Sequence, residues 1–479
     1  MKLPLQQFDF GRLAETFSGK TLIRHGERVI FYRDLPGEIV PRVSRLRMMG
    51  IEEDLRVALV GENSPEMLLE MAALWQIGAV AVPLNYHLPE TRLRQLTEML
   101  DCRLVLCDPD RRGAWGGIPV ESLAAEKPGQ RVDLEDALTA FDPHRPATII
   151  FTSGSTGEPR GAVHTLANHL HSAAGSAANI PLQPGDAWLL PLPLFHVGGL
   201  AIWVRCLLAG ACVEIPTSKN LIGEIATGRI SHLSLVATQL KRLMDEHPTE
   251  AALAGVKVLL LGGSAIPRAL LAEGFRRGWP LVTSYGSTEM SSQITATRPG
   301  GSWQDLLTSG SVLPGRELSI APDGEILVRG ETRFLGYFRD GRIEDPCDSQ
   351  GWLHTGDTGF LDEGERLIVS GRLDNMFICG GENIQPEEIE QILRAQPGVG
   401  EALVVPLSDR EYGAVPVAFI DCSPPIDVPH LQRQLRKLLP GLKVPRHFLA
   451  WPQSPPRVGI KLDREGFRNL AESCLQPGN

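Results

Sequence analysis

The sequence lacks the features that mark secreted, membrane-spanning and nucleic-acid-binding proteins. No stretch of about 18 apolar residues occurs in its 479 residues, and the amino-terminal segment has no apolar signal core. Acidic residues outnumber basic ones, 57 to 47, so no overall basic field is available to hold nucleic acid or an anionic membrane. We therefore expect neither a membrane span nor a nucleic-acid partner, and any anionic ligand must be bound by local groups.

The cysteines are few and scattered. The chain has eight, none of them in a C-x-x-C pair and none in a dense disulfide framework. Reduced thiols that pack as small apolar groups are typical of a reducing compartment, which predicts a cytoplasmic protein. The sequence leaves the oligomeric state open, with a homo-oligomer among the alternatives.

The first 290 residues have the pattern of an α/β region. Hydrophobic residues make up 43% of the chain and charged residues 22%, which is typical of a multidomain globular protein. The apolar run 56–61 predicts a buried strand, and the helical segment after it ends at Gly78. Further apolar runs at 103–107 and 256–261 continue the alternation of strands and helices. This order predicts parallel sheets covered on both faces.

The pattern changes near residue 309. Short alternating strands there flank glycine-containing turns, which predicts antiparallel hairpins and a β-rich subdomain. The last segment, of about 100 residues, contains helices and strands that fit a small α+β domain. We therefore predict a large domain over residues 1–373 and a small mobile C-terminal domain over residues 374–479, with a hinge near Asp374.

The segment TIIFTSGSTGEPRGAVHT predicts a phosphate-binding loop. A buried strand runs into glycines that let backbone N–H groups turn inward, and the hydroxyl groups between them add donors. It is not a Walker loop, because Pro159 stands where that motif requires glycine. Taken alone, the hexapeptide would more often be a plain surface turn. The candidate loop residues are Thr152, Ser153, Gly154, Ser155, Thr156 and Gly157.

Several segments together resemble the signatures of a known family, the adenylate-forming superfamily of acyl-CoA synthetases, adenylation domains and luciferases. They occur in the order and approximate spacing of that family, and the resemblance spans most of the chain. One departure is Arg160, because the family's loop usually ends in Pro-Lys-Gly, and a planar guanidinium does not substitute freely for a point charge. The segments are TSGSTGEPRG, YGSTE (285–289), GWLHTGD (351–357), GRLDNMFICGGENIQPEEIE (371–390) and GIKLDREGF (459–467).

The resemblance implies an enzyme that uses ATP and Mg²⁺ to activate a carboxylic acid as an acyl adenylate, and then transfers the acyl group to CoA. It implies that the loop holds the departing pyrophosphate, that Glu289 helps hold Mg²⁺, and that Asp357 accepts hydrogen bonds from the ribose. Arg372 would meet the ribose and phosphate side, and Lys461 the carboxylate and the α-phosphate. Each of these residues alone would more often be a plain surface residue. The implied catalytic residues are Lys461, His196, Glu289 and Thr152.

Glycines after strands are further candidates. Gly262 and Gly263 follow a buried strand, where ligands collect in open α/β sheets, although a plain turn before a helix is an equal interpretation. By resemblance Gly380 and Gly381 line the tunnel for the pantetheine arm of CoA, while a plain loop is nearly as good an interpretation. The nucleotide-binding set also includes Tyr285, Gly286, Ser287 and Thr288.

The acid substrate is indicated by Arg205, a charge within the otherwise apolar run 191–210. Such a charge either extends to the surface, pairs with a protein carboxylate, or binds a second carboxylate on the substrate. By resemblance His196 closes over the acyl pocket, and Thr238 and Gln239 are pocket residues or part of a capped, packed turn. The segments most resemble those of family members whose acid carries two carboxylates, one activated and one recognised.

Other functions stay open at this point. Another aryl or fatty acyl-CoA ligase, or an enzyme that loads an acid onto a carrier protein, would use the same signatures. A non-catalytic nucleotide-binding regulator is disfavoured, because Lys461, Glu289, Asp357 and Arg372 are all present. The expected partners are therefore a small carboxylic acid, ATP and CoA.

Overall fold

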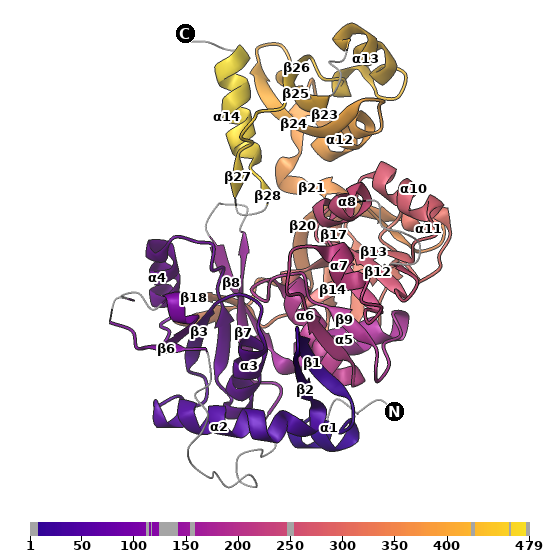
Figure 1. Cartoon of the computed structure of the whole chain (residues 1–479). Coiled ribbons are helices and arrows are strands. Elements are labelled where there is room, and N and C mark those ends of the chain that lie inside the picture. Colours follow the sequence, from indigo (N-terminus) through magenta and orange to yellow (C-terminus); the bar gives the residue numbers. More distant parts are fainter. Residues whose placement is uncertain are drawn as a thin grey trace. The chain divides into compact units, whose positions relative to one another are not determined.

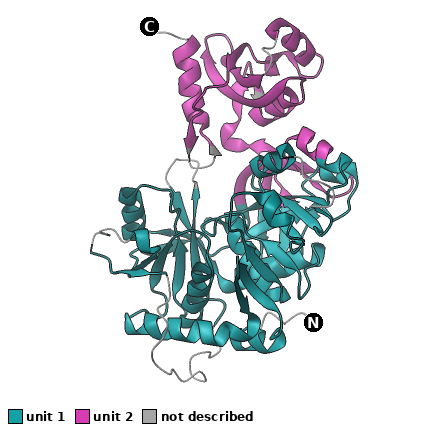
Figure 2. Cartoon of the chain, in the orientation of Figure 1, with its two compact units in different colours: residues 1–266, 274–318, 328–353 teal, residues 267–273, 319–327, 354–479 magenta. Residues whose placement is uncertain are grey.

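The contacts of the chain define two compact units (Figure 2). The computed structural model describes residues 8–111, 115, 117–123, 142–153, 159–246, 253–422, 427–458 and 461–475. Unit 1 comprises Met1–Ile266, Gly274–Leu318 and Val328–Leu353, and unit 2 comprises Pro267–Glu273, Ser319–Leu327 and His354–Asn479. The domain bounds and the hinge near Asp374 stay predictions.

One sheet of unit 1 has eight strands in the order β19-β18-β8-β7-β4-β3-β5-β6 (Figure 1). They are β3 (Arg56–Val60), β4 (Val80–Pro83), β5 (Leu104–Cys107), β6 (Val120–Ser122), β7 (Pro146–Ser153), β8 (Pro159–Thr165), β18 (Gly336–Arg339) and β19 (Arg342–Glu344). The strands from β6 to β7 pair in parallel, whereas β8, β18 and β19 continue the sheet in antiparallel pairs. The parallel centre confirms the prediction from the alternating pattern.

Helix α3 (Pro65–Ile77) follows β3 and shows why the local signals are reliable here. The Ser64 side chain accepts a hydrogen bond from the backbone N–H of Met67, and Gly78 ends the helix in the left-handed conformation, with φ of 82°. Every residue of the helix except Glu66 is buried, as expected for an apolar helix between layers.

The other sheet of unit 1 has nine strands in the order β15-β14-β13-β12-β11-β9-β10-β1-β2. They are β1 (Thr21–His25), β2 (Arg28–Phe31), β9 (Ala187–Leu189), β10 (Cys212–Ile215), β11 (His232–Leu235), β12 (Val258–Leu261), β13 (Leu281–Ser287), β14 (Ser292–Ala296) and β15 (Ser311–Val312). The run from β1 to β13 is parallel, and β2, β14 and β15 pair antiparallel at the two sides. The carboxyl ends of the parallel strands therefore share one edge.

Apart from α1, which precedes β1, the helices up to α11 connect these strands, and most of those that follow a parallel strand cover a face of its sheet (Figure 1). Apart from Arg205, α6 is apolar, and it is buried, as expected of a helix without a polar face. Besides α3 they are α1 (Phe10–Thr16), α2 (Leu35–Met48), α4 (Glu90–Met99), α5 (Leu166–Asn179), α6 (Val197–Ala209), α7 (Leu221–Ile225), α8 (Ala237–Asp245), α10 (Arg268–Arg276) and α11 (Trp303–Leu306).

The predicted change to antiparallel structure is confirmed after residue 309. A four-stranded sheet has the order β16-β17-β20-β21, with β16 (Arg316–Ile320), β17 (Glu325–Gly330), β20 (Leu353–Leu361) and β21 (Leu367–Arg372). The hairpin of β20 and β21 turns at the acidic, glycine-containing segment that the sequence indicates.

The C-terminal part of unit 2 has the expected α+β composition. A five-stranded sheet consists of β22 (Phe377–Cys379), β23 (Glu382–Ile384), β24 (Val399–Asp409), β25 (Gly413–Cys422) and β26 (His447–Ala450). A two-stranded hairpin follows, formed by β27 (Arg457–Val458) and β28 (Lys461–Leu462). The helices are α12 (Pro386–Arg394), α13 (Val428–Leu435) and α14 (Arg464–Leu475), and together these elements enclose a hydrophobic core of their own.

Two observations bear on the environment of the protein. None of the helices in the described parts of the chain has the length and hydrophobicity needed to cross a membrane. All eight cysteines are free thiols, and five of them are buried. The five buried thiols therefore pack as small apolar groups, as the scattered positions of the cysteines predict.

Burial of His232 predicts a loss of stability in acid. Its ring stacks on Trp188, and its Nε2 donates a hydrogen bond of 3.2 Å to the carbonyl of Pro181. Burial lowers the pKa of His232 to about 4, against about 6.5 for an exposed imidazole. Because the unfolded chain gains a proton first, the stability that this neutral ring contributes is complete above about pH 6.5. It is lost as the pH falls from there towards 4, at about 1.4 kcal/mol per pH unit.

Urea unfolding at several pH values between about 7.5 and 4.5 tests this expectation. The free energy of unfolding should fall less steeply with acid in the variant His232→Gln than in the unmodified chain. Equal slopes for the two proteins would show that His232 is protonated as readily in the folded chain as in the unfolded one.

Candidate active site

Several candidate residues of unit 1 follow the carboxyl ends of its parallel strands. Gly262 and Gly263 come directly after β12, and the neighbouring β13 contains the first residues of YGSTE. A Cβ atom at Gly262 would lie 2.9 Å from the hydroxyl oxygen of Ser284, and Gly263 has a φ of 81°, so both positions favour glycine. This edge is where open α/β sheets bind ligands.

The YGSTE segment bends out of the sheet at a β-bulge between Tyr285 and Gly286. A Cβ atom at Gly286 would lie 2.0 Å from the carbonyl oxygen of Ser292, so no side chain fits there. Ser287 ends β13, and its hydroxyl oxygen is buried without a hydrogen-bond partner among the described residues. The bulge thus leads the chain from the sheet into the short 3-10 helix Thr288–Met290.

The phosphate loop joins two paired strands. Thr152 of β7 lies opposite Arg160 of β8, and Ser153 lies opposite Pro159. The hydroxyl oxygen of Thr152 is buried and has no hydrogen-bond partner in the described parts of the chain, which is consistent with a ligand contact. The side chain of Ser153 and the residues Gly154, Ser155, Thr156 and Gly157 lie outside the described residues.

Glu289 is held in the 3-10 helix by Tyr337 of β18 and by Phe334, which precedes that strand. Its Oε1 accepts a hydrogen bond of 2.7 Å from the hydroxyl group of Tyr337, and its carbonyl accepts one of 2.8 Å from the N–H of Phe334. The carbonyl of Thr288 accepts a hydrogen bond of 2.7 Å from Nε2 of His164. Burial lowers the pKa of this imidazole to about 4, which keeps it neutral near pH 7.

These residues fit a magnesium ion. The carboxylate of Glu289 is hydrogen-bonded to a neutral phenol, and unpartnered hydroxyl groups of Thr152 and Ser287 are found among the described residues at the ends of β7 and β13. No group of three or more histidines, cysteines or acidic residues that could hold a metal by itself is found in the described part of the chain. A single carboxylate suits Mg²⁺, which keeps several waters and binds substrate phosphates.

Arg205 lies in α6 with 4% of its surface exposed, and its partners are neutral. Its Nη2 donates hydrogen bonds of 2.8 Å to Oε1 of Gln293 and 3.3 Å to the hydroxyl group of Ser292. Its guanidinium carbon lies 5.1 Å from the ring centroid of Trp188, and its Nε is buried without a partner among the described residues. No ion pair with a described carboxylate is found. Burial lowers the pKa of Arg205 to about 10, so its charge remains at pH 7.

Sequence reasoning missed a second buried arginine beside this group. Arg316 donates hydrogen bonds to the carbonyl of Gln293 at 2.7 Å and to the carbonyl and hydroxyl oxygens of Ser172 at 3.2 and 3.1 Å. Burial, together with the nearby charge of Arg205, lowers the pKa of Arg316 to about 9. Two buried cations with neutral partners make this region attractive to an anion. No local signal marks Arg316 or Gln293, because both lie in ordinary strand patterns.

The remaining acyl-pocket candidates lie where loops meet helices. His196 precedes α6 and its ring lies 4.6 Å from that of Phe195. Thr238 and Gln239 are in the first turn of α8, after β11. Oε1 of Gln239 accepts a hydrogen bond from the N–H of Val236, so this residue caps its own helix. The capped turn that the sequence allows is therefore present, and a substrate contact of Thr238 or Gln239 stays a prediction.

Asp357 and Arg372 lie opposite each other in the hairpin of β20 and β21. Nη1 of Arg372 donates a hydrogen bond of 3.1 Å to Oδ1 of Asp357, and its other nitrogens form a fork with the carboxylate of Asp374 at 3.0 and 3.1 Å. The hydrogen bonds with Asp374 are the main cause that raises the pKa of Arg372. The structure thus brings together two nucleotide-binding candidates and the residue predicted as the hinge.

The other candidates of unit 2 lie in β-hairpins. Gly380 and Gly381 form the two-residue turn between β22 and β23, with φ of 57° and 87°, which is the conformation of a type I′ turn. A role in a CoA tunnel stays a prediction. Lys461 begins β28 and pairs with Val458 of β27, and its side chain lies outside the described residues.

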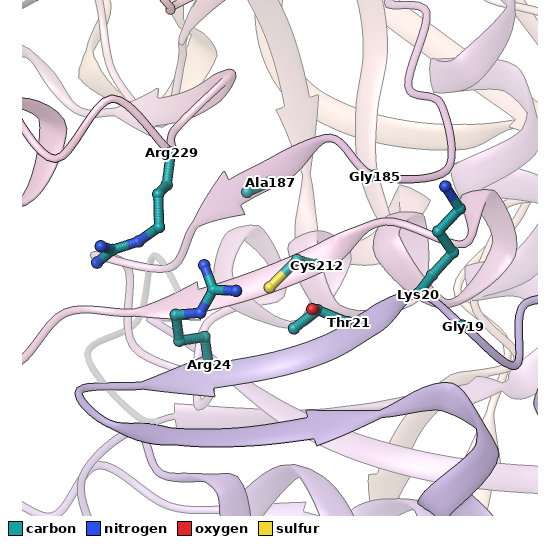
Figure 3. Close-up of a pocket in the computed structure, with 8 residues that line it drawn as sticks. All are labelled: Gly19, Lys20, Thr21, Arg24, Gly185, Ala187, Cys212 and Arg229. Carbon is teal, nitrogen blue, oxygen red and sulfur yellow. The ribbon is translucent and has the colours of Figure 1, made fainter.

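A cavity of about 310 Å³ lies at the opposite edge of the nine-stranded sheet, at the amino ends of β1, β9 and β10 (Figure 3). Lys20, Arg24 and Arg229 line it. The buried carboxylate of Glu214 lies 3.5 Å from Arg24 and 3.1 Å from Arg229. Because the protein itself neutralises much of this charge, and no candidate residue lies there, we do not assign the substrate to this cavity.

Comparison with known proteins gives matches along most of the chain. The model of the AMP-binding enzyme family matches residues 11–338, and that of the AMP-binding enzyme C-terminal domain matches residues 388–457. The 2-succinylbenzoate–CoA ligase of Salmonella typhimurium is 36% identical over 94% of this chain and 95% of its own length.

Two solved structures of Bacillus subtilis o-succinylbenzoate CoA synthetase are similar along nearly the whole chain. The complex with the acyl-adenylate intermediate OSB-AMP has a TM-score of 0.86 and 28% identity, and covers 98% of both chains. The complex with ATP and magnesium ion has a TM-score of 0.85 and 28% identity, and covers 97% of this chain and 99% of the other.

Proposed function

The chain belongs to the family of AMP-binding enzymes, and from this we propose that it is an ATP-dependent acid–CoA ligase that acts on 2-succinylbenzoate. The enzyme forms the acyl adenylate and then 2-succinylbenzoyl-CoA, a reaction of menaquinone or phylloquinone biosynthesis. ATP and CoA are its co-substrates, and Mg²⁺ is its cofactor. The relatives that share about a third of its residues over nearly their full length carry this name, and the structural observation that supports the acid is the burial of Arg205.

Arg205 supports a substrate with a second carboxylate. Its charge is retained, it has neutral hydrogen-bond partners, and Arg316 adds a second buried charge nearby. A buried cation without a counter-ion is costly, and a substrate carboxylate would relieve this cost on binding. An apolar fatty acid would leave both charges uncompensated. For this reason a dicarboxylic acid is favoured over the fatty acids that other members of the family use.

The chemistry requires that negative charge be neutralised where a carboxylate attacks the α-phosphate of ATP. We assign the oxygen-rich loop from Thr152 to the departing pyrophosphate and Glu289 to Mg²⁺, which when bound neutralises phosphate charge. Asp357 accepts hydrogen bonds from the ribose hydroxyl groups, and Arg372 orients that carboxylate. Lys461 meets the charge that develops on the reacting oxygens. In the second step the thiol of CoA attacks the acyl carbon and AMP leaves.

We also propose that the enzyme works in the cytoplasm with small-molecule partners. The support is the set of eight free cysteines, of which five are buried as reduced thiols.

Pyrophosphate release tests the proposed substrate. Every assay contains the full chain, Mg²⁺, ATP and CoA, and one acid is varied between assays. The acids are 2-succinylbenzoate, the two analogues that each lack one of its carboxylates, a long-chain fatty acid and an amino acid. We expect 2-succinylbenzoate to give the highest kcat/KM, by about 10-fold or more over either analogue, since each lacks a reacting or a recognised carboxylate. A faster reaction with the fatty acid would assign the enzyme to that substrate class. Activity that depends on a carrier protein in place of CoA would assign it to carrier loading.

A further inference from the structure

Arg160 stands where the family's loop usually has lysine, and its position in the sheet indicates a role. It lies opposite Thr152 in the pair of β7 and β8, and it is two residues before Ala162, which lies opposite Tyr337 of β18. Residues two apart on a strand share a face, so Arg160 and Tyr337 are diagonal neighbours across the strand pair. Between them the small side chain of Ala162 leaves room for a contact.

The contact is a cation–π interaction. The guanidinium carbon of Arg160 lies 4.2 Å from the centroid of the Tyr337 ring. The same ring carries the hydroxyl group that donates a hydrogen bond of 2.7 Å to Oε1 of Glu289. Within the described residues, this is the hydrogen bond that fixes the Glu289 side chain. A continuous line of contacts thus runs from the end of the phosphate loop to the carboxylate assigned to the metal.

We propose that Arg160 is a positioning residue, which acts through Tyr337 to hold the carboxylate of Glu289 ready for Mg²⁺. This inference rests on the proposed function, since it takes Glu289 as the metal-binding carboxylate. The cation on the ring face fixes the ring and strengthens the phenol as a hydrogen-bond donor to a charged acceptor. A planar guanidinium stacks on an aromatic ring better than an ammonium group does, which gives the replacement of lysine by arginine a physical reason.

The alternative is that Arg160 binds the phosphates of ATP directly, as a cation at the end of a phosphate loop could. The two roles differ in their dependence on metal. A direct contact contributes to ATP affinity with or without Mg²⁺, whereas a positioning role contributes only to the part of the affinity that Mg²⁺ adds. The two roles also differ in whether the effect of Arg160 requires the hydroxyl group of Tyr337.

Isothermal titration calorimetry of ATP binding separates these roles without any turnover. The full chain is titrated with ATP in excess Mg²⁺ and again in EDTA, with neither acid nor CoA present, and the ratio of the two affinities gives the contribution of the metal. We expect Tyr337→Phe and Arg160→Met each to reduce this ratio by about 3- to 10-fold, the size of a lost hydrogen bond or stacked cation. The affinity in EDTA should stay within about 2-fold of the unmodified chain.

The double variant and the conservative variant complete the test. Arg160→Met combined with Tyr337→Phe should be no worse than Tyr337→Phe alone, because Arg160 acts through the hydroxyl group. Arg160→Lys should recover part of the loss. The matched control is Arg329→Met, which removes another arginine that is stacked on an aromatic ring, at 4.3 Å from the centroid of Trp352, and should leave the ratio unchanged.

Three results would overturn the inference. One is a loss in Arg160→Met that is equal with and without Mg²⁺ and additive with Tyr337→Phe, which would assign Arg160 to the phosphates. Another is an unchanged ratio in Arg160→Met, and the last is a similar loss in the Arg329→Met control. If the unmodified chain failed to bind ATP in Mg²⁺, the proposed function itself would be wrong, and this inference with it.

Discussion

Replacing Lys461 by alanine is expected to slow formation of the acyl adenylate by about 100-fold or more, the effect of removing a preorganised charge donor. The reason is that negative charge grows on the reacting oxygens as the carboxylate attacks the α-phosphate, and a fixed cation stabilises that transition state more than the ground state. The thiol step has no such requirement, so thioester formation from supplied acyl adenylate should lose much less.

The two half-reactions are measured separately, by pyrophosphate release without CoA and by thioester formation from synthetic acyl adenylate. Lys461 begins the short strand β28, whose backbone pairing with β27 does not depend on the side chain, so alanine should preserve the fold. The control is Lys437→Ala, an exposed lysine of the same unit, which should leave both rates unchanged. An equal loss in both half-reactions of a folded Lys461→Ala variant would contradict the assignment.

Replacing Arg205 by alanine is expected to lower kcat/KM for 2-succinylbenzoate by about 10- to 150-fold, since a charge-assisted hydrogen bond contributes about 1.5 to 3 kcal/mol. Arg205→Lys should recover only part, because an ammonium group cannot reproduce the planar fork. With the analogue that lacks the recognised carboxylate, kcat/KM of the unmodified enzyme should be close to that of Arg205→Ala. If both substrates suffered alike, Arg205 would be structural and the identity of the acid would be open.

Gln293→Glu offers a second test that leaves no cavity. The new carboxylate would take the place of an amide oxygen that already lies 2.8 Å from Arg205, and would neutralise its charge within the protein. It would also remove the buried amide nitrogen that has no described partner. We expect kcat/KM for the dicarboxylate to fall, as it does in Arg205→Ala. For the analogue that lacks the recognised carboxylate, kcat/KM should change little. Unchanged discrimination between the two acids would contradict the proposed role of Arg205.

The sequence by itself determined that buried strands and helices alternate in the α/β part, and it indicated the family of the chain. The signals there are local. Ser64 and Gly78 define the two ends of α3 by capping interactions within a few residues, and apolar runs mark the buried strands. The sequence motifs also indicated Glu289, Asp357 and Arg372 as candidate site residues. The Gly-Gly pair at 380–381, for which we predicted a CoA-tunnel lining or a plain loop, forms a hairpin turn, and its place in a tunnel stays a prediction.

Only the tertiary structure decided what the charged groups of the site contact. Arg205 meets Gln293, which is 88 positions away in the sequence, and Glu289 meets Tyr337, which is 48 positions away. Arg316 looked like an ordinary strand residue, and its burial beside Arg205 follows from the packing of β16 near α5 and β14. Helix and strand periodicity relates residues a few positions apart, whereas such partners are set by which strands become neighbours, and that depends on how the whole core packs.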